Sequence, residues 1–295
     1  MYDIGRIYQA TSTQDAVEHL VADPSALIIA GGSDVLIKSH HGKSSGCSLV
    51  SIYGLDELRG VTLQDDRSIK IGPLTSFSHI TKNSIIQKYI PVLGEAVDQI
   101  GGPQIRNIGT IGGNISNGVT SADSASTLFA LGANIEITGP SGKRVIPISE
   151  YYVGVGKVCL KNGELLTAIY ITKENYENFT GHYIKYAMRN AMDIATLGCS
   201  VICKLNSQKD TIEDVHIAFG VASPTPMRCP KAEEAIKGMK ITEEMLHVFG
   251  SLTKLEVNPR SSWRASKEFR LQLVEELSKR ALKESIRKSG GVING

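Results

Sequence analysis

Residues 29–36 read IAGGSDVL and residues 109–115 read GTIGGNI, so two short glycine-rich segments lie far apart in the chain. Each follows an apolar run that could form a strand, and each carries two adjacent glycines followed by a small or polar residue. Because glycine has no Cβ, it adopts positive φ angles and lets the backbone approach a ligand closely. Successive backbone N–H groups in such a turn form a nest that attracts anions. The pair therefore predicts that the chain wraps a diphosphate from two sides.

These segments differ from the common nucleotide-binding patterns. Neither has Gly-x-Gly-x-x-Gly at a strand–helix junction, and the chain has no Gly-x-x-x-x-Gly-Lys-Ser/Thr. A Rossmann or P-loop fold is disfavoured, whereas a diphosphate-bearing cofactor such as FAD stays open. Either segment alone could be an ordinary turn between strands, closed by its neighbouring Asn or Asp. The two together, with Asp123 shortly after the second, favour cofactor binding.

Composition narrows the class of protein further. With 295 residues the chain can hold two or three subdomains, and a formal net charge of +2 argues against a broad nucleic-acid footprint. The N-terminus lacks a basic region followed by an apolar one, and no apolar run reaches membrane-spanning length. We therefore expect a cytoplasmic protein with no membrane segment.

The cysteines and histidines predict no metal site. Five scattered cysteines are typical of reduced thiols in a cytoplasmic protein, and their spacing matches no iron–sulfur pattern. Two of them are four residues apart in an apolar segment, where a strand would put both on one buried face. The adjacent His40 and His41 have no third ligand in the pattern. The cysteines are Cys47, Cys159, Cys199, Cys203 and Cys229.

A charged, turn-rich stretch at residues 172–180 divides the chain. Helical and strand-like patterns mix before it, which indicates an α+β unit. After it, three strand-like runs suggest a small antiparallel sheet, and the remainder has helical periodicity. The last helix should bury Leu271, Leu273, Val274 and Leu277. The predicted domains are 1–176, with subdomains of about 1–55 and 56–176, and 177–295.

Five motifs in order give the chain a family resemblance. Together they resemble the FAD-binding medium subunit of the molybdenum hydroxylases, over essentially the whole chain, and most closely the FAD-binding subunit of bacterial xanthine dehydrogenases. The resemblance implies a two-subdomain FAD-binding domain of the vanillyl-alcohol-oxidase (PCMH) type. A CO dehydrogenase flavoprotein C-terminal-like domain, with a three-stranded antiparallel sheet and helices, should follow it. The motifs are AGGSD at 30–34, PQIRN at 103–107, TIGGN at 110–114, TSAD at 120–123 and SWRAS at 262–266.

The resemblance also implies which residues contact FAD. One segment should lie along the diphosphate and adenosine, a second should form the other diphosphate turn, and polar positions should meet the sugar or ribityl hydroxyls. Two apolar residues and a lysine should lie beside the flavin. Asp34 and Asp123 could instead cap helices, and Lys185 could be an ordinary exposed strand residue. The implied set is Leu27, Ile28, Ile29, Ala30, Gly31, Gly32, Ser33, Asp34, Gly109, Thr110, Ile111, Gly112, Gly113, Asn114, Asp123, Leu165, Ile184 and Lys185.

The implied activity places no catalytic side chain on this chain, because the flavin carries the chemistry. A large subunit should hold molybdopterin and oxidise a purine, and a small subunit should hold two [2Fe-2S] clusters. The FAD held here should pass electrons to NAD+, in a heterotrimer or a dimer of heterotrimers. Two alternatives stay open. The same flavin role could serve a hydroxylase of nicotinate, an aldehyde or another heterocycle, or the chain could be a scaffold that binds no cofactor.

Overall fold

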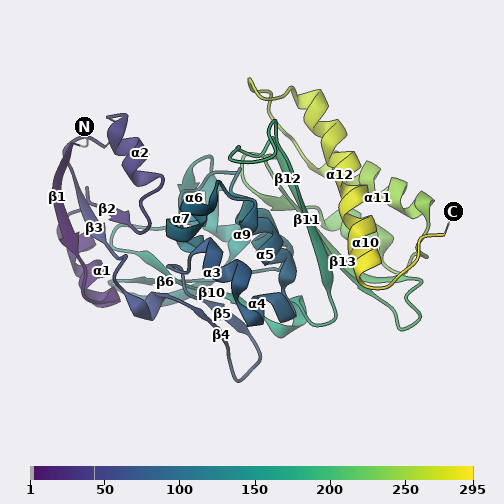
Figure 1. Cartoon of the computed structure of the whole chain (residues 1–295), viewed down its shortest axis with the longest axis horizontal. Coiled ribbons are helices and arrows are strands. Elements are labelled where there is room, and N and C mark those ends of the chain that lie inside the picture. Colours follow the sequence, from purple (N-terminus) through teal and green to yellow (C-terminus); the bar gives the residue numbers. More distant parts are fainter. Residues whose placement is uncertain (1–2, 43, 295) are drawn as a thin grey trace.

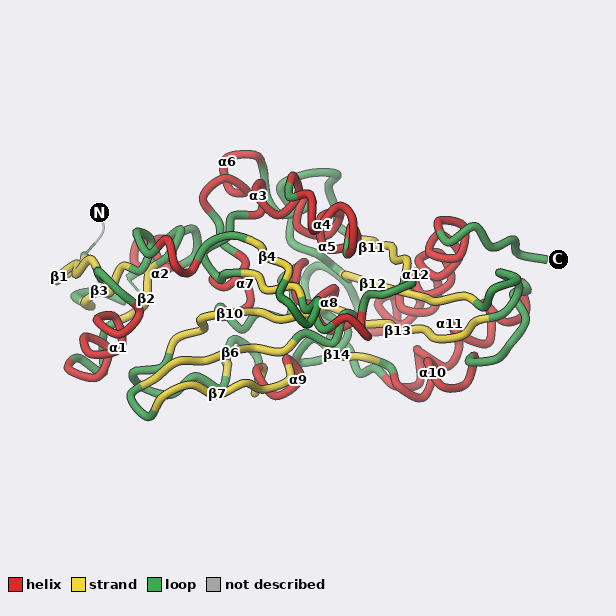
Figure 2. The backbone as a smooth tube through the Cα atoms, turned by 90° about the horizontal axis from the view of Figure 1, so that it is seen from below, coloured by secondary structure: helices red, strands yellow, loops and turns green. Residues whose placement is uncertain are grey.

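The computed structural model describes residues 3–42 and 44–294 as three units that follow one another along the long axis of the molecule (Figure 1). We call them the N-terminal unit (residues 4–51), the central unit (61–171) and the C-terminal unit (180–288). Each has its own sheet. The two ends of the chain lie at opposite ends of the long axis (Figures 1 and 2).

The N-terminal unit is a three-stranded parallel sheet with the strand order β1-β3-β2. Parallel neighbours need crossover connections, which two helices supply. The first helix begins at a Ser12 cap that accepts a hydrogen bond from the N–H of Asp15, and it buries an apolar face. The elements are β1 (Ile4–Gln9), α1 (Thr13–Ala22), β2 (Leu27–Ile29), α2 (Val35–His40) and β3 (Cys47–Ser51).

The central unit is built on a five-stranded antiparallel sheet with the order β4-β5-β10-β6-β7. Its middle strand is apolar and buried, and Ile169 lies opposite both Ile71 and Ile135. The strands are β4 (Val61–Leu63), β5 (Ile69–Ile71), β6 (Asn134–Gly139), β7 (Gly142–Pro147) and β10 (Leu165–Ile171), with a small hairpin of β8 (Tyr152–Gly154) and β9 (Lys157–Val158).

Short helices pack around this sheet. Pro91 and Pro103 each stand at the first position of a helix, where the missing N–H costs nothing. All eight residues of α8 are buried, so this helix belongs to the core of the molecule. The helices are α3 (Phe77–Lys82), α4 (Ser84–Tyr89), α5 (Pro91–Asp98), α6 (Pro103–Ile108), α7 (Ile111–Ser116), α8 (Asp123–Ala130) and α9 (Ile148–Tyr151).

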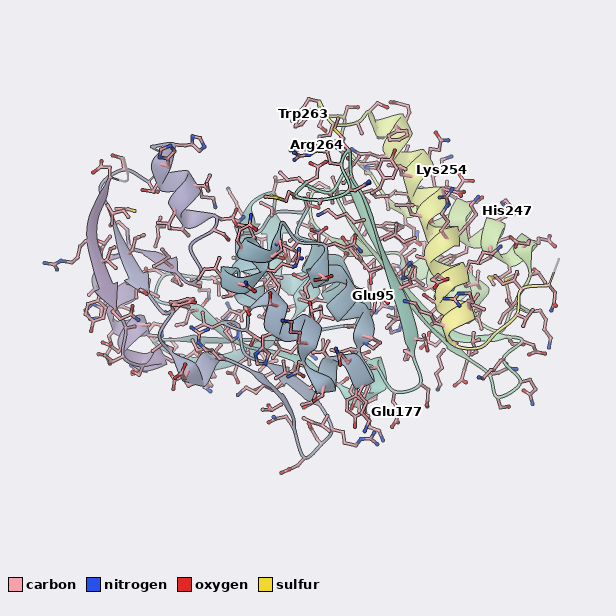
Figure 3. The ribbon with its side chains drawn as sticks, viewed as in Figure 1. Glu95, Glu177, His247, Lys254, Trp263 and Arg264 are labelled. Atoms are coloured by element: carbon pink, nitrogen blue, oxygen red, sulfur yellow. The ribbon has the colours of Figure 1, made fainter. Side chains whose placement is uncertain are left out.

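The C-terminal unit has a four-stranded antiparallel sheet whose two faces meet different partners. Its own α12 and α10 pack on one side, and α5 and α8 of the central unit contact the strands as well. Glu95 of α5 lies where these units meet (Figure 3). The elements are β11 (Thr180–Tyr186), β12 (Leu197–Leu205), β13 (Ile212–Gly220), β14 (Met227–Arg228), α10 (Pro230–Ile236), α11 (Glu243–Glu256) and α12 (Lys267–Lys288).

Cys199 and Cys203 are both buried in the core of this unit, as the strand spacing predicts. Burial raises the pKa of both thiols, that of Cys203 to about 12. Among the described residues, no group of His, Cys, Asp and Glu side chains could hold a metal ion. Nor is any helix in the described ranges long and apolar enough to cross a membrane.

The predicted fold class is confirmed: an α+β FAD-binding part precedes a separate antiparallel sheet with helices. Two local predictions are wrong. The C-terminal sheet has four strands and not three, because the short β14, which ends just before Pro230, pairs with β13. The apolar run before the second glycine-rich segment is not a strand but α6, and that segment connects α6 to α7. Pro103 at the first position of α6 accounts for this outcome, since proline starts helices well.

Truncation of a single buried leucine tests the packing of α12. Leu273, Val274 and Leu277 are buried and Leu271 packs partly buried against the same core, as predicted. Leu277→Ala should lower the free energy of unfolding by about 2–5 kcal/mol because it leaves a cavity. Leu255→Ala on α11 is the matched control, since that side chain is 79% exposed. Equal urea midpoints for both variants would contradict this packing.

Candidate functional site

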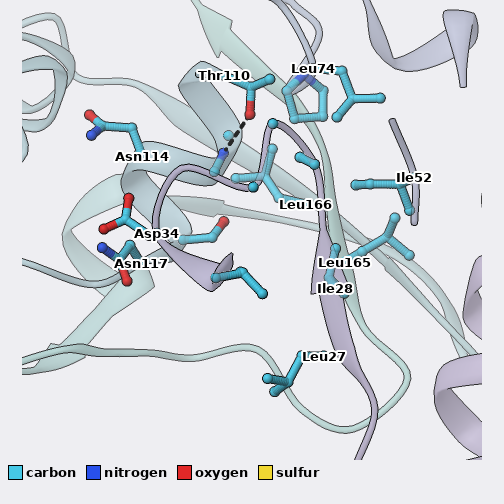
Figure 4. Close-up of a pocket in the computed structure, with 18 of the residues that line it drawn as sticks. Leu27, Ile28, Asp34, Ile52, Leu74, Thr110, Asn114, Asn117, Leu165 and Leu166 are labelled. Carbon is cyan, nitrogen blue, oxygen red and sulfur yellow. Dashed lines mark hydrogen bonds between the residues drawn. The ribbon is translucent and has the colours of Figure 1, made fainter. Parts of the chain in front are cut away.

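A cavity of about 640 Å³ lies between the N-terminal and central units (Figure 4). Protein cavities that bind small molecules typically have volumes of about 300–1,000 Å³. Its walls come from β2 and the turn after it, from Pro73 to Phe77, from the start of α7, and from residues 160–166. Leu27, Ile28 and Leu165 supply apolar surface, while the two glycine-rich segments supply backbone.

The first glycine turn, residues 31–34, has the geometry of an anion-binding nest. Gly32 has a φ of +76°, which is the left-handed conformation that glycine tolerates. Among the described residues, no acceptor is found for the backbone N–H groups of residues 31–34. Four consecutive N–H donors are thus left for a ligand that binds in the cavity. Asp34 does not use its carboxylate to cap α2 with any described N–H group, so the capping alternative fails for this residue.

The second glycine turn, residues 109–113, is different. The N–H groups of Ile111 and Gly112 donate to the carbonyl oxygens of Thr75 and Pro73, at 3.1 and 2.8 Å. The N–H of Gly113 donates to the Oγ1 of Thr110 at 3.2 Å (Figure 4). These donors are already used, so the nest predicted here is wrong. The glycines also do not adopt positive φ, because Gly112 and Gly113 are helical.

Close packing explains the glycines of the second turn. A Cβ on Gly112 would lie 2.4 Å from the Cβ of Pro73, which real Cβ atoms do not approach. The turn therefore presses directly onto the segment that leads into α3. In the cavity it supplies a wall of backbone atoms, whereas the first turn supplies the hydrogen-bond donors.

The two turns touch each other through backbone alone. A Cβ on Gly31 would lie 1.9 Å from the carbonyl oxygen of Ile108 and 3.3 Å from the Cα of Gly109. Any side chain at position 31 would force the N-terminal unit away from the central unit. This contact brings the sequence-distant glycine segments into one cavity.

Most of the residues implied to contact FAD line this cavity, and five do not. Ile111 is fully buried in the core of the central unit. Ile184 packs against the core of the C-terminal unit. Ile29, Asp123 and Lys185 also lie outside the lining. The residues that line it are Leu27, Ile28, Ala30, Gly31, Gly32, Ser33, Asp34, Gly109, Thr110, Gly112, Gly113, Asn114 and Leu165.

Asp123 and Lys185 form a buried ion pair between the central and C-terminal units. The Lys185 Nζ donates to Asp123 Oδ2 at 2.8 Å, and the Tyr183 hydroxyl donates to Oδ1 at 2.7 Å. The two charged side chains are only 8% and 7% exposed. Burial raises the pKa of the Asp123 carboxyl, whereas both partners favour its charged form. Ala122 is the N-cap of α8, and its side chain caps no described N–H, so Asp123 is the first residue inside this helix.

Sequence reasoning missed two polar residues of the cavity wall. Lys38 and Asn117 both line it, and the Lys38 Nζ donates to Asn117 Oδ1 at 2.6 Å. Periodicity offered a signal for each, because Lys38 lies one helical turn after Asp34 and Asn117 follows Asn114 by three residues. The loop of residues 160–164 was also missed, and in sequence only its nearness to Leu165 points to the site.

Residues 2–174 match the family model described as the FAD binding domain in molybdopterin dehydrogenase, and residues 182–285 match the CO dehydrogenase flavoprotein C-terminal domain. The chain belongs to the FAD-binding subunits of the molybdenum hydroxylases. It is 42% identical to the xanthine dehydrogenase FAD-binding subunit of Escherichia coli O157:H7, over 99% of each chain. It is 27% identical to the nicotinate dehydrogenase FAD-subunit of Eubacterium barkeri, over 77% of each chain.

Solved structures agree with this membership. Carbon monoxide dehydrogenase from Hydrogenophaga pseudoflava contains a chain that matches with a TM-score of 0.91 at 26% identity, covering 97% of this chain and 98% of that one. The predicted family resemblance is therefore confirmed. The cavity also fits the cofactor of this family, because the unused N–H groups of residues 31–34 suit a diphosphate and the apolar wall suits flat rings.

Gly31→Ala tests the contact between the two turns. The new Cβ must move the carbonyl of Ile108, so we expect a loss of about 1–3 kcal/mol in stability together with weaker FAD binding. Gly154→Ala is the control, because no described atom lies within 4 Å of its Cβ and its φ is not positive. Thermal melting and FAD titration measure both effects. If Gly31→Ala behaves like the control, the backbone contact does not form.

Lys185→Met tests the ion pair between the units. It leaves the Asp123 carboxylate buried without its ammonium partner, so we expect a loss of about 3–5 kcal/mol at neutral pH. The folded variant then holds an acid whose pKa lies above its unfolded value. Its stability should rise as the pH falls towards that pKa. Urea unfolding between neutral and mildly acidic pH measures this, and the double variant Asp123→Leu/Lys185→Met should recover part of the loss. A loss that does not change with pH would contradict the assignment.

Proposed function

We propose that this chain is the FAD-binding subunit of a heterotrimeric, cytoplasmic, molybdenum-containing xanthine dehydrogenase. A large partner subunit would carry molybdopterin and oxidise hypoxanthine or xanthine, and a small one would carry [2Fe-2S] clusters. When bound, FAD would accept electrons from those clusters and deliver them to NAD+. The observation that carries the proposal is the 42% identity to a xanthine dehydrogenase FAD-binding subunit over nearly the whole of both chains.

The chain's own residues would bind and orient the cofactor. The N–H groups of residues 31–34 would donate to its diphosphate, and the backbone of residues 109–113 would limit where that group can lie. Leu27, Ile28 and Leu165 would cover its apolar parts and exclude water. Beside the cavity, the buried pair of Asp123 and Lys185 would fix the C-terminal unit relative to it.

The thiols of this chain support the assignment of the iron–sulfur clusters to a different subunit. Cys199, Cys203 and Cys229 are buried, and burial raises the pKa of each. Iron–sulfur clusters require thiolates, which such surroundings disfavour. The proposal therefore assigns the clusters to a partner.

Residues 183–193 would form the approach for NAD+. Beyond β11 this segment is exposed, with Met188 63% and Met192 53% accessible. The Arg189 side chain donates to the carbonyl of Met192 and holds the loop together. Exposed apolar and cationic groups of this kind suit a nicotinamide dinucleotide.

The assembled complex gives the test. We expect purified complex to contain FAD and to oxidise hypoxanthine and xanthine with NAD+ as acceptor, faster than with oxygen. Nicotinate and aldehydes serve as control substrates. Oxidation of either in place of purines would assign the chain to another molybdenum hydroxylase, as its similarity to a nicotinate dehydrogenase subunit allows. A complex without flavin would make it a scaffold.

A further inference from the structure

The charged side chains that line the cavity are unevenly paired. They are Asp34, Lys38, Lys161 and Glu164. Glu164 is neutralised by Arg144, whose Nε and Nη2 donate to its two oxygens at 3.0 and 2.8 Å. Lys38 and Lys161, by contrast, form no salt bridge with a described residue, and Lys38 donates to Asn117 instead. Lys161 still interacts electrostatically with the Glu164 carboxylate, whereas the Lys38 ammonium donates its hydrogen bond to a neutral amide.

Lys38 differs from the other charged residues because its side chain extends from the N-terminal unit to the central unit. It belongs to α2 of the N-terminal unit, and its backbone N–H donates to the carbonyl of Asp34, so it lies one turn beyond the first glycine turn. Its ammonium donates to Asn117, which ends α7 in the central unit. The partner is a neutral amide, so this bond leaves the charge of the lysine uncompensated.

A diphosphate in this cavity needs more than the first glycine turn supplies. The turn at residues 109–113 has used the N–H groups of Ile111, Gly112 and Gly113 within the protein. The donors of residues 31–34 are neutral backbone groups. Hydrogen bonds between a cation and a phosphate are about twice as strong as neutral ones. A cation next to the donor turn would therefore add most to the binding of this anion.

We propose that Lys38 supplies the counter-charge for the cofactor's diphosphate, and that its bond to Asn117 holds the ammonium across the cavity until the cofactor takes it over. This inference rests on the proposed FAD-binding function. The ammonium exchanges a neutral amide oxygen for a charged phosphate oxygen, so the exchange is favourable only when the diphosphate is present. Lys38 is then a cofactor-binding residue, and Asn117 positions it.

The test is an FAD titration of the full chain after its flavin has been removed. Lys38→Met should weaken FAD binding about tenfold, as expected for one charge-assisted hydrogen bond. Because added salt screens a charge contact, the difference from wild type should shrink as the salt concentration rises. Lys38→Arg should restore most of the affinity. Melting temperatures should match the wild type, since Lys38 is exposed.

Two control variants separate the counter-charge from other roles. Lys231→Met removes an exposed cation of α10 that does not line the cavity, and it should leave FAD affinity unchanged. Asn117→Ala removes the bond but keeps the cation, so it should bind FAD at least as well as wild type. A Lys38→Met variant with wild-type affinity, a salt-independent loss, or an equal loss in Asn117→Ala would overturn the inference. Wild-type chain that takes up no FAD would instead refute the proposed function.

Discussion

The contact between Gly31 and the carbonyl of Ile108 governs the rest of the site. Without side chains between them, the N-terminal and central units approach until backbone meets backbone. The cavity is the space left on either side of this contact, bounded by β2 and by the start of α7. The shape of the cavity therefore depends on the missing Cβ of Gly31. A Cβ there would meet a backbone carbonyl, so a change of side-chain rotamers nearby could not make room for it.

The two glycine turns carry similar sequences but do different physical work. The N–H groups of the first turn have no acceptor among the described residues, and Gly32 has a positive φ, so this turn presents donors. The second uses its donors to attach α7 to residues 73–75, and its glycines are there for close packing. The first turn thus provides hydrogen-bond donors to the cavity, and the second provides a closely packed backbone wall.

Much of this could be predicted from the sequence, and the exceptions have physical causes. The fold class and family followed from ordered motifs. Glycine chemistry pointed to the two glycine turns, and the family resemblance implied the other cavity-lining residues of segments 27–34 and 109–114. A Gly-Gly pair does not reveal whether it serves positive φ or close packing, because that depends on what lies against it. Pairings such as Lys38 with Asn117 and Asp123 with Lys185 could not be predicted, since they join residues 79 and 62 positions apart.

The ion pair between Asp123 and Lys185 has a consequence for the evolution of this chain. It crosses from one unit to the next at a place where both charges are nearly dry. If recombination replaced the C-terminal unit with that of a relative, the chimera would keep its stability only if the new unit also placed a cation beside Asp123. The pair thus acts as a compatibility requirement, which ties the inheritance of the antiparallel sheet to that of the cofactor-binding part.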